Sequence, residues 1–302
     1  MDDDLTELHP DLRDRNWQRA ARRRARTAAL WSGARRSPRA LITAVAAGLV
    51  LVAVTMLHLD GRLAALVTGA FGSSAHDPAR PFLGTPAAEW ADGPAGFVPP
   101  PAAPIGAYTS DDVAAATEQV RQFLITSRLD RRVIEGHDAR PVLDLLAPYA
   151  RRQTEALLKP DDGASTRRLH TRIAKENRLA RAEPKVSGIM AVGLAEDGAL
   201  LVSAKYVIAY AFDTTGRPLD AVAMERSDIN YEVRAGAQWR KGARGLWIGA
   251  SPGVVAYSYR CEPWGRGFLS PPLDSPTPAG GRGDKAFFDL NKTLATYGNC
   301  FG

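Results

Sequence analysis

The stretch Leu-Leu-Val-Ser-Ala-Lys-Tyr-Val-Ile-Ala-Tyr-Ala-Phe, residues 200–212, decides the fold of this chain. Apolar side chains occupy every second position, and the alternation runs from Leu200 to Phe212 without a break. A period of two is typical of a β-strand that buries one face. The pattern therefore predicts a long strand in an antiparallel sheet.

Further strand patterns lie on both sides of this one. Residues 186–194 alternate and lead into Glu196-Asp197-Gly198, which is a hairpin signal. Residues 219–233 form a predicted third strand. Residues 246–261 form a fourth, interrupted at Ser251-Pro252-Gly253.

Two helices are predicted before the sheet. The first opens at Ser110, a capping residue followed by two acids. Its apolar face comprises Val113, Ala116, Val120, Leu124 and Ser127. The second begins around Pro141 and carries a stripe of Val142, Leu145, Leu146 and Tyr149. Pro148 is expected to kink or end it before residues 151–158 resume. Residues 167–182 form either a third, basic helix or a loop. Helices followed by antiparallel strands predict an α+β fold with a bent sheet wrapped on helices.

A single apolar run, Ala40 to Leu59, contains no charge. Its length as a helix is about 30 Å, the thickness of a bilayer core. Ten arginines against six acids precede it. The positive-inside rule then places residues 1–39 in the cytoplasm and the chain after the span outside.

Two other interpretations of this run fit less well. A cleaved signal has a shorter basic region and an apolar stretch of about 7–15 residues. A buried core helix normally shows a polar face, whereas this run has only Thr43, Thr55 and His58. The sequence therefore predicts a retained signal-anchor at residues 40–59.

The basic tail carries a juxtamembrane cluster of Arg22, Arg23, Arg24, Arg26, Arg35, Arg36 and Arg39. Such a cluster is expected to face anionic lipid, each residue contributing about 1 kcal/mol. DNA or a cytoplasmic protein is the alternative partner. The net charge is +6, of which the tail holds +4, so the near-balanced remainder argues against nucleic-acid binding outside.

Residues 60–107 comprise a juxtamembrane stretch and a Pro-rich linker, and residues 108–302 form the predicted extracytoplasmic domain. Cys261 and Cys300 are the two cysteines of the chain, and outside the cytoplasm such a pair most often forms a disulfide. Free or metal-binding thiols are the alternative.

No catalytic or cofactor-binding motif emerges, so we expect no enzyme activity, cofactor or metal. His137-Asp138 is an adjacent acid/base pair, and His170 with Asp161 and Asp162 is a conceivable metal set, but loop positions explain both better. Trp264 and Phe268 lie in a Gly- and Pro-rich stretch. They are candidates either for an exposed recognition patch or for a plug at the open end of the domain.

In topology and order of elements, the chain resembles bitopic proteins with a nuclear-transport-factor-2-like (cystatin-like) cone domain. Among these it is similar to assembly components of type IV secretion and conjugation machines, and to membrane proteins associated with mycobacterial cell-entry transporters. The resemblance implies a helix-helix-antiparallel-sheet cone and a non-enzymatic scaffold that associates with itself and with other envelope subunits. The alternative is a tethered ligand-binding or catalytic cone, with a pocket lined by Tyr206, Tyr210 or Trp247.

Overall fold

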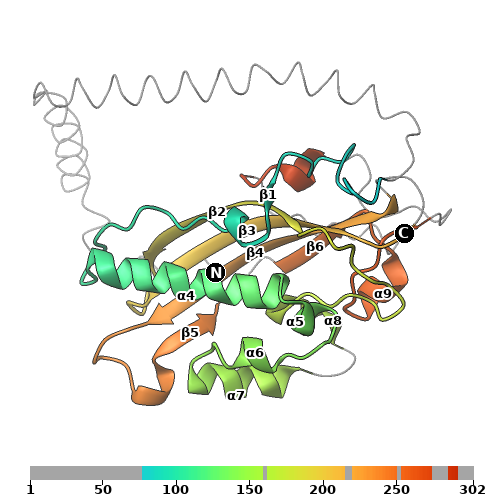
Figure 1. Ribbon diagram of the computed structural model, residues 1–302. Coiled ribbons are helices and arrows are strands. Elements are labelled where there is room, and N and C mark those ends of the chain that lie inside the picture. The colour runs from blue at the N-terminus through green and yellow to red at the C-terminus, as the bar shows by residue number, and fades with distance from the viewer. Residues whose placement is uncertain (1–76, 159–161, 215–219, 250–252, 274–284, 292–302) are drawn as a thin grey trace, which may run out of the picture. The chain divides into compact units, whose positions relative to one another are not determined.

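The computed structural model describes residues 77–158, 162–214, 220–249, 253–273 and 285–291. Their centre is a six-stranded antiparallel sheet (Figure 1). Its strands are β1 (Ala91–Asp92), β2 (Lys185–Leu194), β3 (Leu200–Ala211), β4 (Val222–Arg234), β5 (Gly245–Ile248) and β6 (Gly253–Tyr257). The order is β1-β2-β3-β4-β5, and β6 also pairs with β4.

The alternating stretch is confirmed as the central strand β3. It pairs along its length with β2 on one side and β4 on the other. The hairpin between β2 and β3 closes with Leu194 opposite Leu200, and Gly198 adopts φ +85°, which favours glycine. The side chains from Leu200 to Phe212 at even positions are all buried, as the period predicts.

The predicted fourth strand is two strands that share one partner. β5 pairs with the end of β4, from Tyr231 to Arg234, whereas β6 pairs with its first half, from Met224 to Asp228. The interruption at Ser251-Pro252-Gly253 therefore separates two short strands along the same edge of β4.

The first predicted helix is confirmed as α4 (Ser110–Arg128). Its cap is Thr109, one residue before the expected Ser110: the Asp112 amide donates to the Thr109 hydroxyl at 3.2 Å, and the Thr109 amide donates to the Asp112 carboxylate at 2.9 Å. This reciprocal capping box satisfies two amides at the helix start. All five residues of the predicted apolar face are buried.

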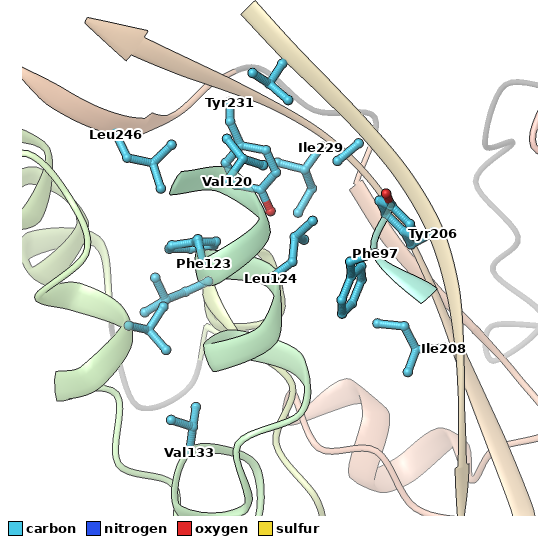
Figure 2. Packing of buried hydrophobic residues seen from close by; sticks show 14 of the residues in the cluster. Phe97, Val120, Phe123, Leu124, Val133, Tyr206, Ile208, Ile229, Tyr231 and Leu246 are labelled. Carbon is cyan, nitrogen blue, oxygen red and sulfur yellow. The ribbon is translucent and has the colours of Figure 1, made fainter. Parts of the chain in front are cut away.

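The buried face of α4 packs against one face of the sheet, called the helical face below. Figure 2 shows Val120, Phe123 and Leu124 from the helix directed toward side chains of the strands. Phe97 completes this layer, because its ring lies 4.8 Å from that of Tyr206 in an edge contact. The main apolar core therefore lies between α4 and the sheet.

The opposite face of the sheet carries a second, smaller apolar cluster. Its buried members are Phe82, Ala87, Val207, Ala209, Ala211, Val222, Met224, Tyr257 and Phe287. Phe82 and Ala87, together with Phe97 on the helical face, belong to the stretch predicted to be a linker. The described part of that stretch, residues 77–107, thus contributes side chains to both cores.

The predicted helix-helix-sheet cone is wrong, because the described residues form a six-stranded antiparallel sheet with one long helix. The second predicted helix is interrupted, as expected, but the interruption precedes Pro148. Its residues form α6 (Arg140–Leu143) and α7 (Pro148–Leu157), separated by an extended turn. There Leu146 bridges to Leu246, and the Ala147 amide donates to the Leu246 carbonyl at 2.9 Å. Pro148 lacks an amide donor, so it begins a helix more readily than it continues one.

The other described helices are short: α5 (Arg131–Ile134), α8 (Gly163–Leu169) and α9 (Cys261–Gly265), with 3-10 turns η2 (Gly93–Gly96), η4 (Lys241–Ala243) and η5 (Lys285–Phe288). The described residues are therefore an antiparallel sheet with one long helix. Of residues 167–182, Arg167–Leu169 end α8 and the remainder is a loop.

None of the helices described here has the length and apolarity needed to cross a membrane. The predicted span at residues 40–59 and the basic tail at residues 1–39 lie outside the described residues.

Candidate interaction site

The predicted aromatic pair lies on the segment that follows β6. Trp264 belongs to α9, and Phe268 follows a turn at Gly267, where φ is +85°. Two backbone hydrogen bonds attach the segment to a neighbouring extended stretch: the Leu269 amide donates to the Arg172 carbonyl at 2.7 Å, and the Ala174 amide donates to the Leu269 carbonyl at 2.9 Å. The segment is thus fixed to the domain by its backbone.

Trp264 is half-buried and packs against the main core. The guanidinium of Arg167 lies over its ring at 4.3 Å, and the same group donates to the Trp264 carbonyl at 2.5 Å. The ring of Tyr259 lies 5.3 Å away. Stacked Arg–Trp pairs contribute about 0.5–1 kcal/mol at exposed sites and more where water is excluded.

Phe268 has the same kind of cover. The guanidinium of Arg172 lies 4.1 Å from its ring centre, and the ring of His137 lies 5.2 Å away. The Nε2 atom of His137 is 2.7 Å from the Ile173 carbonyl oxygen, which fixes that ring. Burial lowers the pKa of both Arg167 and Arg172, the groups that cover the two aromatic rings.

Two glycines permit this arrangement. A Cβ placed on Gly267 would lie 2.7 Å from the Cα of Gly163, at the start of α8. Side chains at either position would separate the two backbones and with them the Arg167–Trp264 stack. Trp264 and Phe268 therefore form a half-buried patch in which an arginine covers each ring, called the aromatic patch below.

Cys261 begins α9, is half-buried, and packs against the main core. Cys300 lies outside the described residues. Their pairing therefore stays a prediction, as does lipid contact by the arginine cluster from Arg22 to Arg39.

A buried polar network lies next to the aromatic patch. Its residues were not predicted from the sequence to form a site. Arg128, at the end of α4, donates to Glu225 of β4 at 2.8 Å, and both side chains are at most 1% exposed. The hydroxyl of Thr171 donates to the same carboxylate oxygen at 3.0 Å. Tyr210 of β3 lies 3.2 Å from that hydroxyl and donates to the Arg128 carbonyl at 3.0 Å. The network joins the long helix, the loop after α8 and two central strands.

His170 is part of the same buried region. Its side chain is 3% exposed, and neither ring nitrogen has a hydrogen-bond partner among the described residues. Burial, with the nearby charge of Arg128, lowers the pKa of His170 to about 3, so the ring is neutral near pH 7. Burial also raises the pKa of Glu225, against the attraction of Arg128.

One signal in the sequence marks this network. Ala223, Glu225, Ser227, Ile229 and Tyr231 share the strand period that faces the helical core, so Glu225 stands at an inward position of β4. A carboxylate there requires a buried cation. Nothing in the local sequence identifies Arg128 as that cation, because it is 97 residues away.

Among the residues that the structure describes, neither histidine constellation forms a site, and Asp161 lies outside those residues. The Asp138 carboxylate accepts from the Arg140 guanidinium at 2.7 Å, whereas the His137 ring contacts the Ile173 carbonyl, so the two side chains have different partners. Asp162 caps α8 by accepting from the Ser165 amide at 3.0 Å, and His170 follows the other end of that helix. Within the residues that the structure describes, no three metal-ligating side chains converge.

The pocket of the alternative, ligand-binding interpretation does not form at the two tyrosines. Tyr206 and Tyr210 are at most 1% exposed and belong to the main core. Trp247 is half-buried, with the Arg234 guanidinium 4.1 Å from its ring centre. Three surface pockets, which include Leu157, Phe82 and Phe268 respectively, are not lined by Tyr206, Tyr210 or Trp247.

A different surface is open for association, the outer edge of β2. Its neighbour β1 pairs only with Lys185 and Val186. From Ser187 to Leu194, no described backbone group outside the β2–β3 ladder hydrogen-bonds to this edge. Ile189 is 49% exposed and Leu194 is 44% exposed. This open edge, Ser187–Ala195, contains no charge and no proline.

Comparison of the chain with protein-family models, with curated proteins and with solved structures found no match.

Proposed function

We propose that this chain is a non-enzymatic, single-pass membrane subunit of a bacterial cell-envelope assembly of the secretion or conjugation type. In this proposal residues 40–59 anchor it, the basic tail contacts anionic lipid inside, and the folded domain associates outside with copies of itself and with other subunits. The uncharged run and the arginines before it support the topology.

The open edge of β2 carries the proposal. Soluble proteins protect such edges with lysines, prolines or bulges, because unpaired N–H and C=O groups accept strands from other chains. This edge lacks charge and proline and presents Ile189 and Leu194 to solvent. An unprotected edge of this kind is typical of a strand that pairs in an assembly.

Site-specific photo-crosslinking in intact cells tests the proposal. A photoreactive residue replaces Ile189 in the full-length chain, and the control replaces Leu157 on α7, which is similarly exposed at 62%. We expect discrete adducts with envelope proteins or with this chain from position 189 alone. Adducts with cytoplasmic proteins, or the same adducts from both positions, would contradict the proposed function.

A further inference from the structure

The direction of the backbone groups on the open edge follows from two hydrogen bonds. The Pro184 carbonyl accepts from Gly93 at 2.8 Å, on the side away from β3. The Ala195 amide donates to Ala199 at 2.9 Å, toward β3. Because these directions alternate along a strand, the even positions from Gly188 to Leu194 present their N–H and C=O groups outward. These groups form a ladder ready for a further strand.

We propose that the open edge pairs antiparallel with the same edge of a second copy of this chain, with Ala191 on the two-fold axis. The inference rests on the proposed function and names the partner of that same edge. Each sheet would then continue into the other through β2.

Symmetry restricts the register. Residues directly opposite in an antiparallel pair lie on the same face, so a symmetric pair is centred on a residue and not between two residues. The open edge runs from Ser187 to Ala195, and Ala191 is its middle position. A centre on Met190 would place Leu194 opposite Val186, which β1 already pairs. The Ala191 register alone uses the whole edge.

The side chains are self-complementary in this register. Ile189 lies opposite Gly193 of the second copy, and a Cβ on Gly193 has nothing within 4 Å, so the space is open. Leu194 lies opposite Gly188, where the ring of Tyr206 already fills the space, since a Cβ on Gly188 would lie 2.0 Å from it. The pair of Ile189 with Gly193 therefore carries the complementarity of this register. No like charges oppose each other, because the edge is uncharged.

Charge-swapped variants of the full-length chain in mild detergent test this register. Ala191→Lys and Ala191→Glu each place two like charges opposite one another, and Ala191 is exposed, so the monomer tolerates both. The matched control is Ala237→Lys, at an exposed position in the loop after β4. Dimerisation is measured by analytical ultracentrifugation across a concentration series, and mixed dimers by capture of untagged Ala191→Glu on tagged Ala191→Lys.

We expect wild type and Ala237→Lys to dimerise, and each Ala191 variant alone to bind itself about tenfold or more weakly. The mixture of Lys and Glu variants regains the dimer at low salt and loses it as salt rises. Dimerisation of Ala191→Lys at wild-type strength, or a mixture that stays monomeric, overturns the β2 pairing. Either result leaves the proposed function in place if crosslinks to other envelope proteins persist at position 189.

Discussion

Within the described part of the chain, each face of the sheet buries an ion pair, and the two pairs start from neighbouring residues of β4. On the helical face, Glu225 pairs with Arg128 of α4 at 2.8 Å. On the opposite face, Arg226 pairs with Asp228 at 2.9 Å, two residues along the same strand. All four side chains are at most 3% exposed. Two pairs of equal burial thus differ in what they connect.

The first pair connects parts of the chain that are distant in sequence, and the second is local. Arg128 and Glu225 tie the long helix to the central sheet, with Thr171 and Tyr210 in the same network. Arg226 reaches from the strand to the carbonyls of Phe287 and Asp289 at 3.1 and 3.0 Å. We infer that the helical face holds the domain together, whereas the opposite face attaches a short C-terminal segment.

The largest effect is expected from breaking the pair on the helical face. Arg128→Met leaves the Glu225 carboxylate buried without its cation, and this costs about 3–5 kcal/mol of unfolding free energy. The double variant Arg128→Met/Glu225→Leu removes both charges and should recover most of that loss. Urea unfolding of the four corners of this cycle measures the coupling. Additive losses in the double variant would show that the two charges do not interact.

A smaller effect on stability is expected from substituting two glycines of β2, because their Cβ positions lie on opposite faces of the sheet. A Cβ on Gly188 points to the helical face and would lie 2.0 Å from the ring of Tyr206. A Cβ on Gly193 points to the opposite face and meets nothing within 4 Å. Gly188→Ala should therefore destabilise by about 1–3 kcal/mol through overpacking, and Gly193→Ala by less than about 0.5 kcal/mol.

Thermal unfolding of both variants in the full-length chain, at concentrations where it is monomeric, measures this difference. Equal melting temperatures would contradict the packing of Tyr206 on β2 shown by the structure. A large loss in Gly193→Ala alone would indicate that the opposite face is covered at that position.

The strands could be predicted because their information is local. The alternation around Tyr206 and the turn at Gly198 each depend on residues that are close in sequence, and both gave the correct hairpin. The same holds for α4, whose buried stripe follows from a period of 3.6. Local pattern was enough where an alternation or a helical stripe lies within one continuous stretch of sequence.

The helical layer beyond α4 could not be predicted in the same way. Val142, Leu145 and Leu146 have helical spacing, yet Leu146 bridges to a strand, because a contact with Leu246 competes with the helix. The Arg128–Glu225 pair could not be predicted either, because its two residues are distant in sequence. The Arg cover of Trp264 likewise depends on a close approach of Gly163 and Gly267. These features depend on tertiary contacts.

The third prediction concerns the pH dependence of stability that His170 causes on the helical face. Over a single pH unit this is the smallest of the three expected changes in unfolding free energy. In the folded state its pKa is lowered to about 3, whereas an unfolded histidine titrates near its ordinary value of 6.5. Between these values the unfolded chain binds more protons, so stability falls as pH falls. The slope from this residue is at most about 1.4 kcal/mol per pH unit.

His170→Phe removes this proton while keeping a planar ring in the buried site. The variant should lose stability less steeply than wild type from pH 6.5 down to pH 4. It should be no less stable at pH 7, because no described residue hydrogen-bonds to the ring nitrogens that it replaces. Urea midpoints across that range measure both slopes. Parallel slopes would mean that His170 is solvated in the folded chain, and the helical face would then lack the sealed interior that distinguishes it from the opposite face.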